Sequence, residues 1–262
     1  MRGGGLKAGR YAYVFYATND TYAFALLAFA RLLRQVGIRD DIDLLALHLP
    51  LSPPLEKAIR EAGIESRPVS PPRQVRNKRF RDCLTKLRLF ELLDYDRVVF
   101  ADVDAIPLRR LDYLFELPIA GPVAAPLAYW VPQPFWTSAL LVVEPSAACR
   151  RRVMHHVEAA RRSWDCDMDI LNAAFAAEIH TLPRDAFCLN SEWEEEDRPG
   201  YFPDPVDAYA RVSLVHFTAL GKPWSYSPEE VHSLRPKAHP IFYELWERWK
   251  RASDEASACL TA

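Results

Sequence analysis

The stretch Arg97–Pro107, RVVFADVDAIP, of this 262-residue chain joins a strand-like apolar segment to a pair of acidic side chains. Val98–Ala101 is a continuous apolar run, typical of a strand buried on both faces. Asp102 and Asp104 follow it. Because side chains alternate along an extended chain, both carboxylates point to the same side, where they repel unless a cation lies between them. A hard divalent ion, Mn²⁺ or Mg²⁺, suits such oxygen ligands.

Strands and helices alternate ahead of this stretch. The sequence predicts strands at Tyr11–Ala17, Asp43–Leu49 and Ile64–Val69, a helix over Thr21–Val36 with Asp20 as its N-cap, and a helix from Ser52 to about Ala62. This order is the pattern of a parallel α/β sheet with right-handed crossovers. Ligands of such sheets bind at the carboxyl ends of the strands, where the two aspartates lie. A capped surface turn is the alternative for a D-x-D taken alone.

The remaining segments extend the same pattern. A basic, proline-containing loop at Ser70–Phe80 precedes a predicted helix over Cys83–Leu93, with Asp82 as its N-cap. Further helices are expected at Leu111–Leu117, Ala147–Arg162, Asp167–Ala177 and His239–Arg251, and strands at Val123–Leu127, Ala139–Val143 and Ser213–Phe217. We expect a flexible N-terminus at residues 1–9 and a single domain over residues 10–262 that ends in the C-terminal helix.

Composition narrows the class of protein. Half of the residues are hydrophobic, enough for a sizeable core, and a net charge of −2 gives no indication of a nucleic-acid partner. The 5 cysteines include no C-x-x-C pair, so a reducing, cytosol-like compartment is favoured. The longest apolar run, Tyr22–Ala30, is too short for an integral membrane segment. We expect a soluble, cytoplasmic protein; a lumenal location would require an anchor outside this sequence.

Three other places could contribute to a site. His216 lies on a late apolar strand, where an imidazole beside two carboxylates would complete an Mn²⁺ site; a core histidine is the alternative. Gly221 and Lys222 follow it, and they suit close backbone approach and a phosphate charge, although an ordinary loop has the same composition. Thr18 and Asn19 end the first strand and could contact a base or ribose, or cap the next helix.

A cluster of acids marks the start of a later helix. Asp165, Asp167 and Asp169 lie at the predicted N-terminus of the helix over Asp167–Ala177. Carboxylates are favoured there by the helix macrodipole, which accounts for all three without a function.

Several motifs occur together in a specific order. They read A-T-N-D-x-Y, T-K-L-R-L-F-E-L, Y-D-R-V-V-F-A-D-V-D, D-Y-L-F-E-L-P, S-A-L-L-V-V-E-P-S, D-M-D-I-L-N and V-H-F-x₄-K-P-W. In this order, from about Tyr11 to Trp224, the chain resembles the glycogenin-like retaining glycosyltransferases, glycosyltransferase family 8. The resemblance implies an α/β fold of the GT-A nucleotide-diphospho-sugar transferase type, with a Rossmann-like mixed sheet flanked by helices. It also implies a UDP-sugar donor and Mn²⁺ (or Mg²⁺). Because members often dimerise, a homodimer is a further expectation.

The resemblance also implies roles for individual residues. Asp102, Asp104 and His216 match the metal ligands of the family, and Asp167 and Lys86 become the catalytic candidates. Residues matched to donor binding are Thr18, Asn19, Tyr22, Lys86, Asp102, Val103, Asp104, Ser138, Gly221 and Lys222. Asp167 is either the nucleophile of a covalent mechanism or a residue that orients the sugar while the acceptor hydroxyl attacks from the same face; we favour the second.

Departures from the family pattern surround the expected sugar pocket. Met168 replaces the glutamine of a D-Q pair, Thr137 and Ala139 replace the asparagine and glycine of N-S-G, and Ala219 replaces a glycine. The transferred hexose (glucose, galactose or N-acetylglucosamine) therefore stays open. The short motifs Y-A-T-N-D-T-Y and L-N-S-E-W also resemble those of a fungal N-acetylglucosaminyltransferase branch of the family. The acceptor could be a glycan, a polyol, a lipid or a protein.

Two other functions fit parts of the pattern. A haloacid-dehalogenase-like phosphatase would use Asp102 as nucleophile and Asp104 as general acid. A non-catalytic nucleotide-sugar-binding protein would bind donor and metal without turnover. The aromatic loop Tyr129–Trp136 could contact an acceptor glycan, but packing within the protein is the favoured interpretation.

Overall fold

The structure is a computed structural model that describes residues 9–72, 78–160, 165–195 and 200–260. Most of the expected N-terminal segment, residues 1–8, lies outside these ranges. So do residues 73–77 of the basic loop and the predicted helix end at residues 161–162. The division into a flexible N-terminus and one domain stays a prediction.

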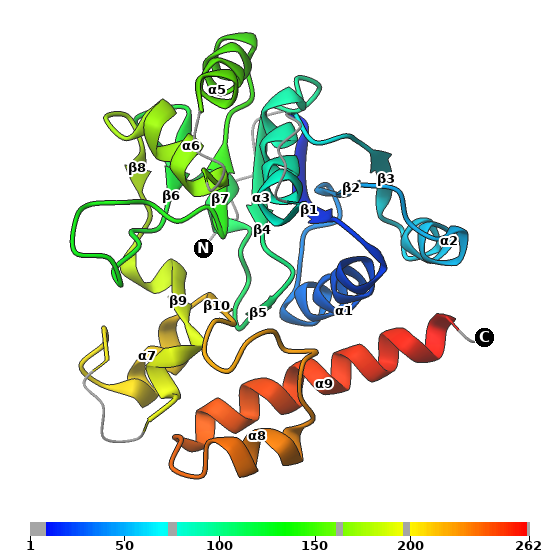
Figure 1. Cartoon of the computed structure of the whole chain (residues 1–262), viewed down its shortest axis with the longest axis vertical. Coiled ribbons are helices and arrows are strands. Elements are labelled where there is room, and N and C mark those ends of the chain that lie inside the picture. Colours follow the sequence, from blue (N-terminus) through cyan, green and yellow to red (C-terminus); the bar gives the residue numbers. More distant parts are fainter. Residues whose placement is uncertain (1–8, 73–77, 161–164, 196–199, 261–262) are drawn as a thin grey trace.

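Seven strands form a mixed sheet in the order β3-β2-β1-β4-β7-β6-β8 (Figure 1). Their bounds are β1 Tyr11–Ala17, β2 Asp43–His48, β3 Glu65–Pro68, β4 Arg97–Ala101, β6 Val123–Ala125, β7 Leu140–Val143 and β8 His180–Thr181. β1 pairs in parallel with β2 and β4, whereas β7 is antiparallel to both β4 and β6. The predicted Rossmann-like mixed sheet is confirmed, and β4 lies at its centre.

Alternate residues of the central strands pack on opposite faces of this sheet. Tyr13, Val99 and Val142 belong to one hydrophobic cluster, together with α1 (Asp20–Val36) and α9 (Pro240–Leu260). Their strand neighbours pack in a second cluster with α5 (Ala147–Ala159), α6 (Asp167–Phe175) and the 3₁₀ helix η1 (Leu84–Glu91). Burial on both faces explains the continuous apolar runs in the sequence, because each buried Val or Leu contributes about 1.5–3 kcal/mol.

A second, smaller sheet continues from the D-x-D. It has the order β5-β10-β9, with β5 at Ala105–Pro107, β9 at Phe187–Leu189 and β10 at Leu214–His216. β10 runs antiparallel to β5 and parallel to β9, and His216 stands opposite Ala105. The chain therefore passes from the large sheet into the small one through Asp102–Asp104, and β10 brings His216 to the same place.

The remaining elements are short. They are α2 (Pro53–Glu61), α3 (Lys78–Cys83), α4 (Tyr113–Glu116), α7 (Pro205–Arg211), α8 (Pro228–Leu234), η2 (Arg184–Ala186) and η3 (Asn190–Trp193). Throughout the described ranges, no helix has the length and apolarity needed to cross a membrane.

Two predicted helix starts are wrong. Asn19, and not Asp20, is the N-cap of α1: its Oδ1 accepts a hydrogen bond from the Tyr22 N–H at 3.2 Å. Asp20 is the first helical residue, and its Oδ1 accepts from the Ser52 N–H at 2.9 Å. The other error is the helix expected over Cys83–Leu93.

That segment is a 3₁₀ helix, and Asp82 lies inside α3 rather than at an N-cap. The buried residues Leu84, Leu87 and Phe90 recur at every third position, which is the period of a 3₁₀ helix. The same spacing also occurs in amphipathic α-helices, so the sequence pattern did not separate the two.

The C-terminal helix is longer than predicted. It was expected over His239–Arg251 but extends from Pro240 to Leu260, and its small residues Ala252 and Ala256 remain buried. The short elements β5, β8, β9, α7 and α8 were not predicted, because too few residues are present to show a period. β6 and β10 are as short as β5, but they lie within the longer apolar segments predicted at Val123–Leu127 and Ser213–Phe217.

Candidate functional site

The backbone of the D-x-D is fixed on both sides of β4. The Asp102 N–H donates to the carbonyl of Ala139, next to β7, at 2.9 Å, and the carbonyl of Asp104 accepts from the N–H of Phe217, after β10, at 2.9 Å. Val103 is buried in the hydrophobic core, so only its backbone could contact a ligand. The backbone that carries the two carboxylates is thus hydrogen-bonded to segments of both sheets.

Asp102, Asp104 and His216 form a compact group. One candidate ligand atom from each of them lies within 4.8 Å of the others. His216 Nε2 is 3.2 Å from Asp104 Oδ1 and 3.9 Å from Asp102 Oδ2. Two carboxylates with an imidazole form a donor set that suits Mn²⁺. The structure therefore brings together the three residues predicted as metal ligands, two from the end of β4 and one from β10.

The carboxyl of Asp104 is held in its ionised form. Burial alone would raise its pKa, but His216 and Lys222 hold that pKa well below its ordinary value. Lys222 forms an ion pair with Asp104 Oδ2, and the carboxylate in turn raises the pKa of Lys222 against the effect of burial. The ionised carboxylate can bind a cation, and the Lys222 ammonium can then exchange the carboxylate for a phosphate.

Asp102 has a different environment. Burial raises the pKa of this carboxyl, and the ammonium of Lys86 offsets the effect only in part. Lys86 Nζ lies 3.0 Å from Asp102 Oδ1, but Oδ1 is buried and has no hydrogen-bond partner of suitable geometry, so its contact with Lys86 is ionic only. A buried oxygen in this state costs free energy, and a bound cation would relieve that cost.

Lys86 connects Asp102 to the N-terminus of α6. Its side chain is 4% exposed, and Nζ lies 2.8 Å from Asp167 Oδ2. It donates to the carbonyl and the hydroxyl of Ser138, both at 3.2 Å, and the Ser138 hydroxyl donates to Asp167 Oδ2 at 2.5 Å. The ring of Phe100 covers the ammonium at 5.0 Å. Lys86, Asp167 and Ser138, predicted separately, thus form one buried network.

The acids at the start of α6 differ in their contacts. Asp169 caps the helix, since its Oδ2 accepts from the Cys166 N–H at 2.9 Å. Asp167 instead points into the Lys86 network: burial would raise its pKa, but Lys86 and the Ser138 hydroxyl hold it below the ordinary value. The helix-start explanation therefore accounts for Asp169, while Asp167 has additional contacts with Lys86 and Ser138.

The predicted nucleotide segment lies beside the predicted phosphate loop. The ring of Tyr22, on α1, packs edge-on against the ring of Trp224 with 5.1 Å between centroids. Trp224 follows Lys222, and Gly221 has a φ of +92°, a backbone conformation that favours glycine. The segment Thr18–Tyr22 and the loop Gly221–Trp224 therefore flank one side of the D-x-D.

Asn190 was not predicted as part of this site. It is fully buried, and its Oδ1 accepts from the N–H groups of Thr218 and Ala219 at 2.8 and 2.9 Å. Its Nδ2 donates to the carbonyl of Ala219 at 3.1 Å. Asn190 thereby fixes the loop between His216 and Lys222. The only indication of Asn190 in the sequence was the short motif L-N-S-E-W, which contains this residue.

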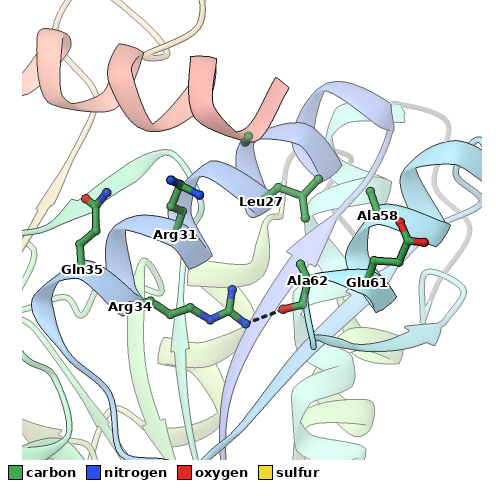
Figure 2. Close-up of a pocket in the computed structure, with 8 residues that line it drawn as sticks. Leu27, Arg31, Arg34, Gln35, Ala58, Glu61 and Ala62 are labelled. Atoms are coloured by element: carbon green, nitrogen blue, oxygen red, sulfur yellow. Dashed lines mark hydrogen bonds between the residues drawn. The ribbon is translucent and has the colours of Figure 1, made fainter. Parts of the chain in front are cut away.

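A separate cavity of about 490 Å³ lies between α1, α2 and the end of α9 (Figure 2). None of the predicted site residues lines it. Its two arginines already have protein partners: Arg34 donates to the carbonyl of Ala62 at 2.6 Å, and Arg31 pairs with Glu255. The chemistry of the candidate site therefore lies at the D-x-D and not in this cavity.

Comparison with known sequences gives a family match and curated relatives. Glycosyl transferase family 8 matches residues 14–227. Glucose N-acetyltransferase 1 of Gibberella zeae is 27% identical over 241 residues, which cover 82% of this chain and 53% of the relative. Glycogenin-1 of Homo sapiens is 26% identical over 250 residues, with coverage of 90% and 70%. The chain thus spans about half the length of the first of these relatives.

Solved structures resemble the fold at low sequence identity. The galactosyltransferase LgtC, in complex with donor and acceptor sugar analogues, has a TM-score of 0.68 at 16% identity, covering 93% of this chain and 95% of LgtC. The apo WbbM bifunctional glycosyltransferase has a TM-score of 0.73 at 16% identity, covering 99% of this chain and 53% of WbbM. At this identity the likeness concerns the fold alone.

Proposed function

Because the chain belongs to glycosyl transferase family 8, we propose that it moves a hexosyl unit from a UDP-sugar to an acceptor hydroxyl, with retention at the anomeric carbon and with Mn²⁺. Family membership confirms the predicted enzyme class, a glycosyltransferase, in preference to a haloacid-dehalogenase-like phosphatase. The likeness to LgtC and WbbM confirms the predicted GT-A fold. The nucleotide, the hexose, the ion and the stereochemistry are part of the proposal.

The observation that carries the proposal is the group of Asp102, Asp104 and His216 beside Lys222. The group fits a hard divalent cation because Asp104 is held ionised and Asp102 Oδ1 has no hydrogen-bond partner. When bound by these three residues, Mn²⁺ (or Mg²⁺) would supply positive charge beside the leaving diphosphate.

The protein's own groups would do the rest of the donor binding. Lys222 is 38% exposed, so its ammonium can turn from Asp104 to the diphosphate and neutralise the charge that develops as the glycosidic bond breaks. Gly221 would allow the backbone to approach the phosphates. Thr18, Asn19 and Tyr22 would contact the nucleotide on the adjacent side, although the Asn19 carboxamide oxygen already caps α1.

The sugar would lie near Ser138 and Asp167. Asp167 carries negative charge that can accept hydrogen bonds from sugar hydroxyls, and Ser138 fixes its direction. We assign Lys86 a positioning role, because it is 4% exposed and its ammonium contacts Asp102, Asp167 and Ser138. It would hold both carboxylates ionised and in place, and so link the metal side of the site to the sugar side.

Asp167→Asn tests how retention is achieved. If Asp167 orients the sugar while the acceptor attacks from the face of the leaving phosphate, the variant should lose about 10–100-fold in kcat, or about 1.4–2.7 kcal/mol. If Asp167 is the nucleophile, the loss should exceed about 10⁴-fold, because an amide cannot form the covalent intermediate. We expect the smaller loss, measured as steady-state product formation.

Asp169→Asn is the matched control. It removes a carboxylate two residues away that caps α6, and it should change turnover less than twofold. A comparable loss in both variants would mean that Asp167 acts through the stability of α6 rather than on the donor.

The proposed function is tested by UDP release from a panel of UDP-sugars, with Mn²⁺ and with EDTA. We expect slow, metal-dependent hydrolysis of one hexosyl donor without added acceptor, at least tenfold above the rate in EDTA. The preferred donor then identifies the sugar. Equal rates with Mn²⁺ and EDTA would contradict the metal role, and the absence of UDP binding in calorimetry would overturn the choice of nucleotide.

A further inference from the structure

Trp130 is an exposed aromatic residue at the edge of the candidate site. It is 42% exposed and lies in the connection between β6 and β7. The other tryptophans whose side chains the structure describes are buried or half-buried. An exposed indole leaves a large apolar surface in water, and single cases are unremarkable. This one, however, is connected to His216 of the metal-ligand group through the ring of Phe187.

Two ring contacts link Trp130 to His216. The centroids of Trp130 and Phe187 are 6.3 Å apart, and those of Phe187 and His216 are 6.0 Å apart. Phe187 lies on β9, and it is buried. The three rings therefore form a row, with the exposed indole of Trp130 at one end and the candidate metal ligand His216 at the other.

Trp130 has a supporting neighbour that is itself held in place by hydrogen bonds and ring stacking. Its ring packs edge-on against Tyr129, with 5.2 Å between centroids. The Tyr129 hydroxyl donates to Glu192 at 2.8 Å and accepts from the Leu189 N–H at 3.0 Å. The Tyr129 ring also stacks on Tyr201 at 3.9 Å. A side chain held in this way loses little conformational entropy when a ligand binds to it.

The location of Trp130 agrees with the direction of the proposed donor. In the sheet order, β1 and its segment Thr18–Tyr22 lie on one side of β4, and β7 and β6 lie on the other (Figure 1). Ser138 and Trp130 belong to the same β6–β7 connection. A donor with its nucleotide near Thr18 and its sugar near Ser138 would direct the anomeric carbon toward the side where Trp130 lies.

We propose that Trp130 is the acceptor platform of this enzyme, on which the pyranose ring of a carbohydrate acceptor stacks beside the metal-ligand group. The inference rests on the proposed function and names the class of its second substrate. A pyranose presents a face of C–H groups that fits an aromatic ring, while its hydroxyls remain available for water and for reaction. An open-chain polyol has no such face.

The test compares methyl pyranosides with glycerol and sorbitol as acceptors. UDP release is measured for wild type, Trp130→Ala and Trp130→Phe, each relative to its own acceptor-free rate. We expect pyranosides, and not polyols, to stimulate the wild type. Trp130→Ala should raise the half-saturating pyranoside concentration at least tenfold without a matching change in the donor KM, and Trp130→Phe should recover most of the effect. Stronger stimulation by a disaccharide than by a monosaccharide would identify a glycan chain, rather than a free sugar, as the source of the ring.

Tyr113→Ala is the control, because Tyr113 is another exposed aromatic residue, on α4. It should leave the half-saturating pyranoside concentration unchanged. The proposed platform would be contradicted by equal half-saturating pyranoside concentrations in wild type and Trp130→Ala. It would also be contradicted if polyols stimulated UDP release as strongly as pyranosides.

Binding measured by saturation-transfer NMR separates this inference from the proposed function. A pyranoside signal that is lost in Trp130→Ala would support the platform even if no UDP-sugar were hydrolysed. A pyranoside signal that persists in Trp130→Ala would overturn it even if donor hydrolysis were confirmed.

Discussion

Asp104→Asn should lower metal-dependent UDP release by about 10³-fold, or about 4 kcal/mol of transition-state stabilisation. The carboxylate is held ionised by His216 and Lys222, and asparagine keeps its shape while removing its charge. The variant should therefore lose affinity for Mn²⁺ and leave Lys222 without its acidic partner. Activity is measured over a range of Mn²⁺ concentrations, because a weakened site should show a raised half-saturating concentration of the ion.

Two further variants make the result specific. Asp102→Asn should show a loss of similar size, since Asp102 is the second carboxylate of the group. Asp40→Asn removes an exposed carboxylate ahead of β2 and should leave activity within twofold of wild type. Melting temperatures show whether each variant is folded. A folded Asp104→Asn protein with normal metal-dependent turnover would rule out Asp104 as a metal ligand.

Lys86→Met should lower the free energy of unfolding at pH 7 by about 3–5 kcal/mol, because it leaves Asp102 and Asp167 as largely buried carboxylates without their shared cation. Methionine retains the aliphatic length of lysine, so the change in packing is small. Turnover should fall as well, because both carboxylates would move from their present positions. The measurement is denaturant unfolding at several pH values.

The pH dependence distinguishes loss of charge from loss of packing. Without Lys86, the pKa of both carboxyls should rise, so protonation then favours the folded state. The loss in free energy of unfolding caused by Lys86→Met should therefore be largest at neutral pH, and it should become smaller as the pH falls through the raised pKa values. In the wild type, the lowered pKa of Asp167 contributes stability above about pH 4 that is lost as the pH falls further. Both trends reduce the difference in free energy of unfolding between wild type and Lys86→Met at acidic pH.

Lys57→Met is the control for this experiment. Lys57 is 70% exposed and pairs with Glu61 on the surface of α2, so its removal should cost less than about 0.5 kcal/mol at any pH. The double variant Lys86→Met with Asp167→Asn also removes one of the two carboxylates that have lost their cation. It should recover part of the lost free energy of unfolding. A pH-independent deficit in Lys86→Met would mean that the lysine matters for packing alone.

Much of the large sheet could be predicted from the sequence, because its strands are long and apolar enough to show their type locally. Tyr11–Ala17 is both the predicted and the observed first strand. Some short elements were missed for the opposite reason: β5 has three residues, too few for any periodicity, and no longer apolar segment surrounds it. The segment after Asp82 was assigned the wrong kind of helix because a spacing of three residues is shared by 3₁₀ and α-helices.

The family, the D-x-D at the end of a buried strand and the residue types of the site could all be predicted from the sequence, since these are properties of local pattern and of motif order. Which candidates contact one another became visible in the fold: β10 brings His216 to Asp104 across 112 positions of sequence, and Lys86 contacts both Asp102 and Asp167. The fold also separated Asp169, a helix cap, from Asp167, and it connected Trp130 to the site. Such contacts depend on strand pairing and on burial, and neither can be predicted from the spacing of residues along the chain.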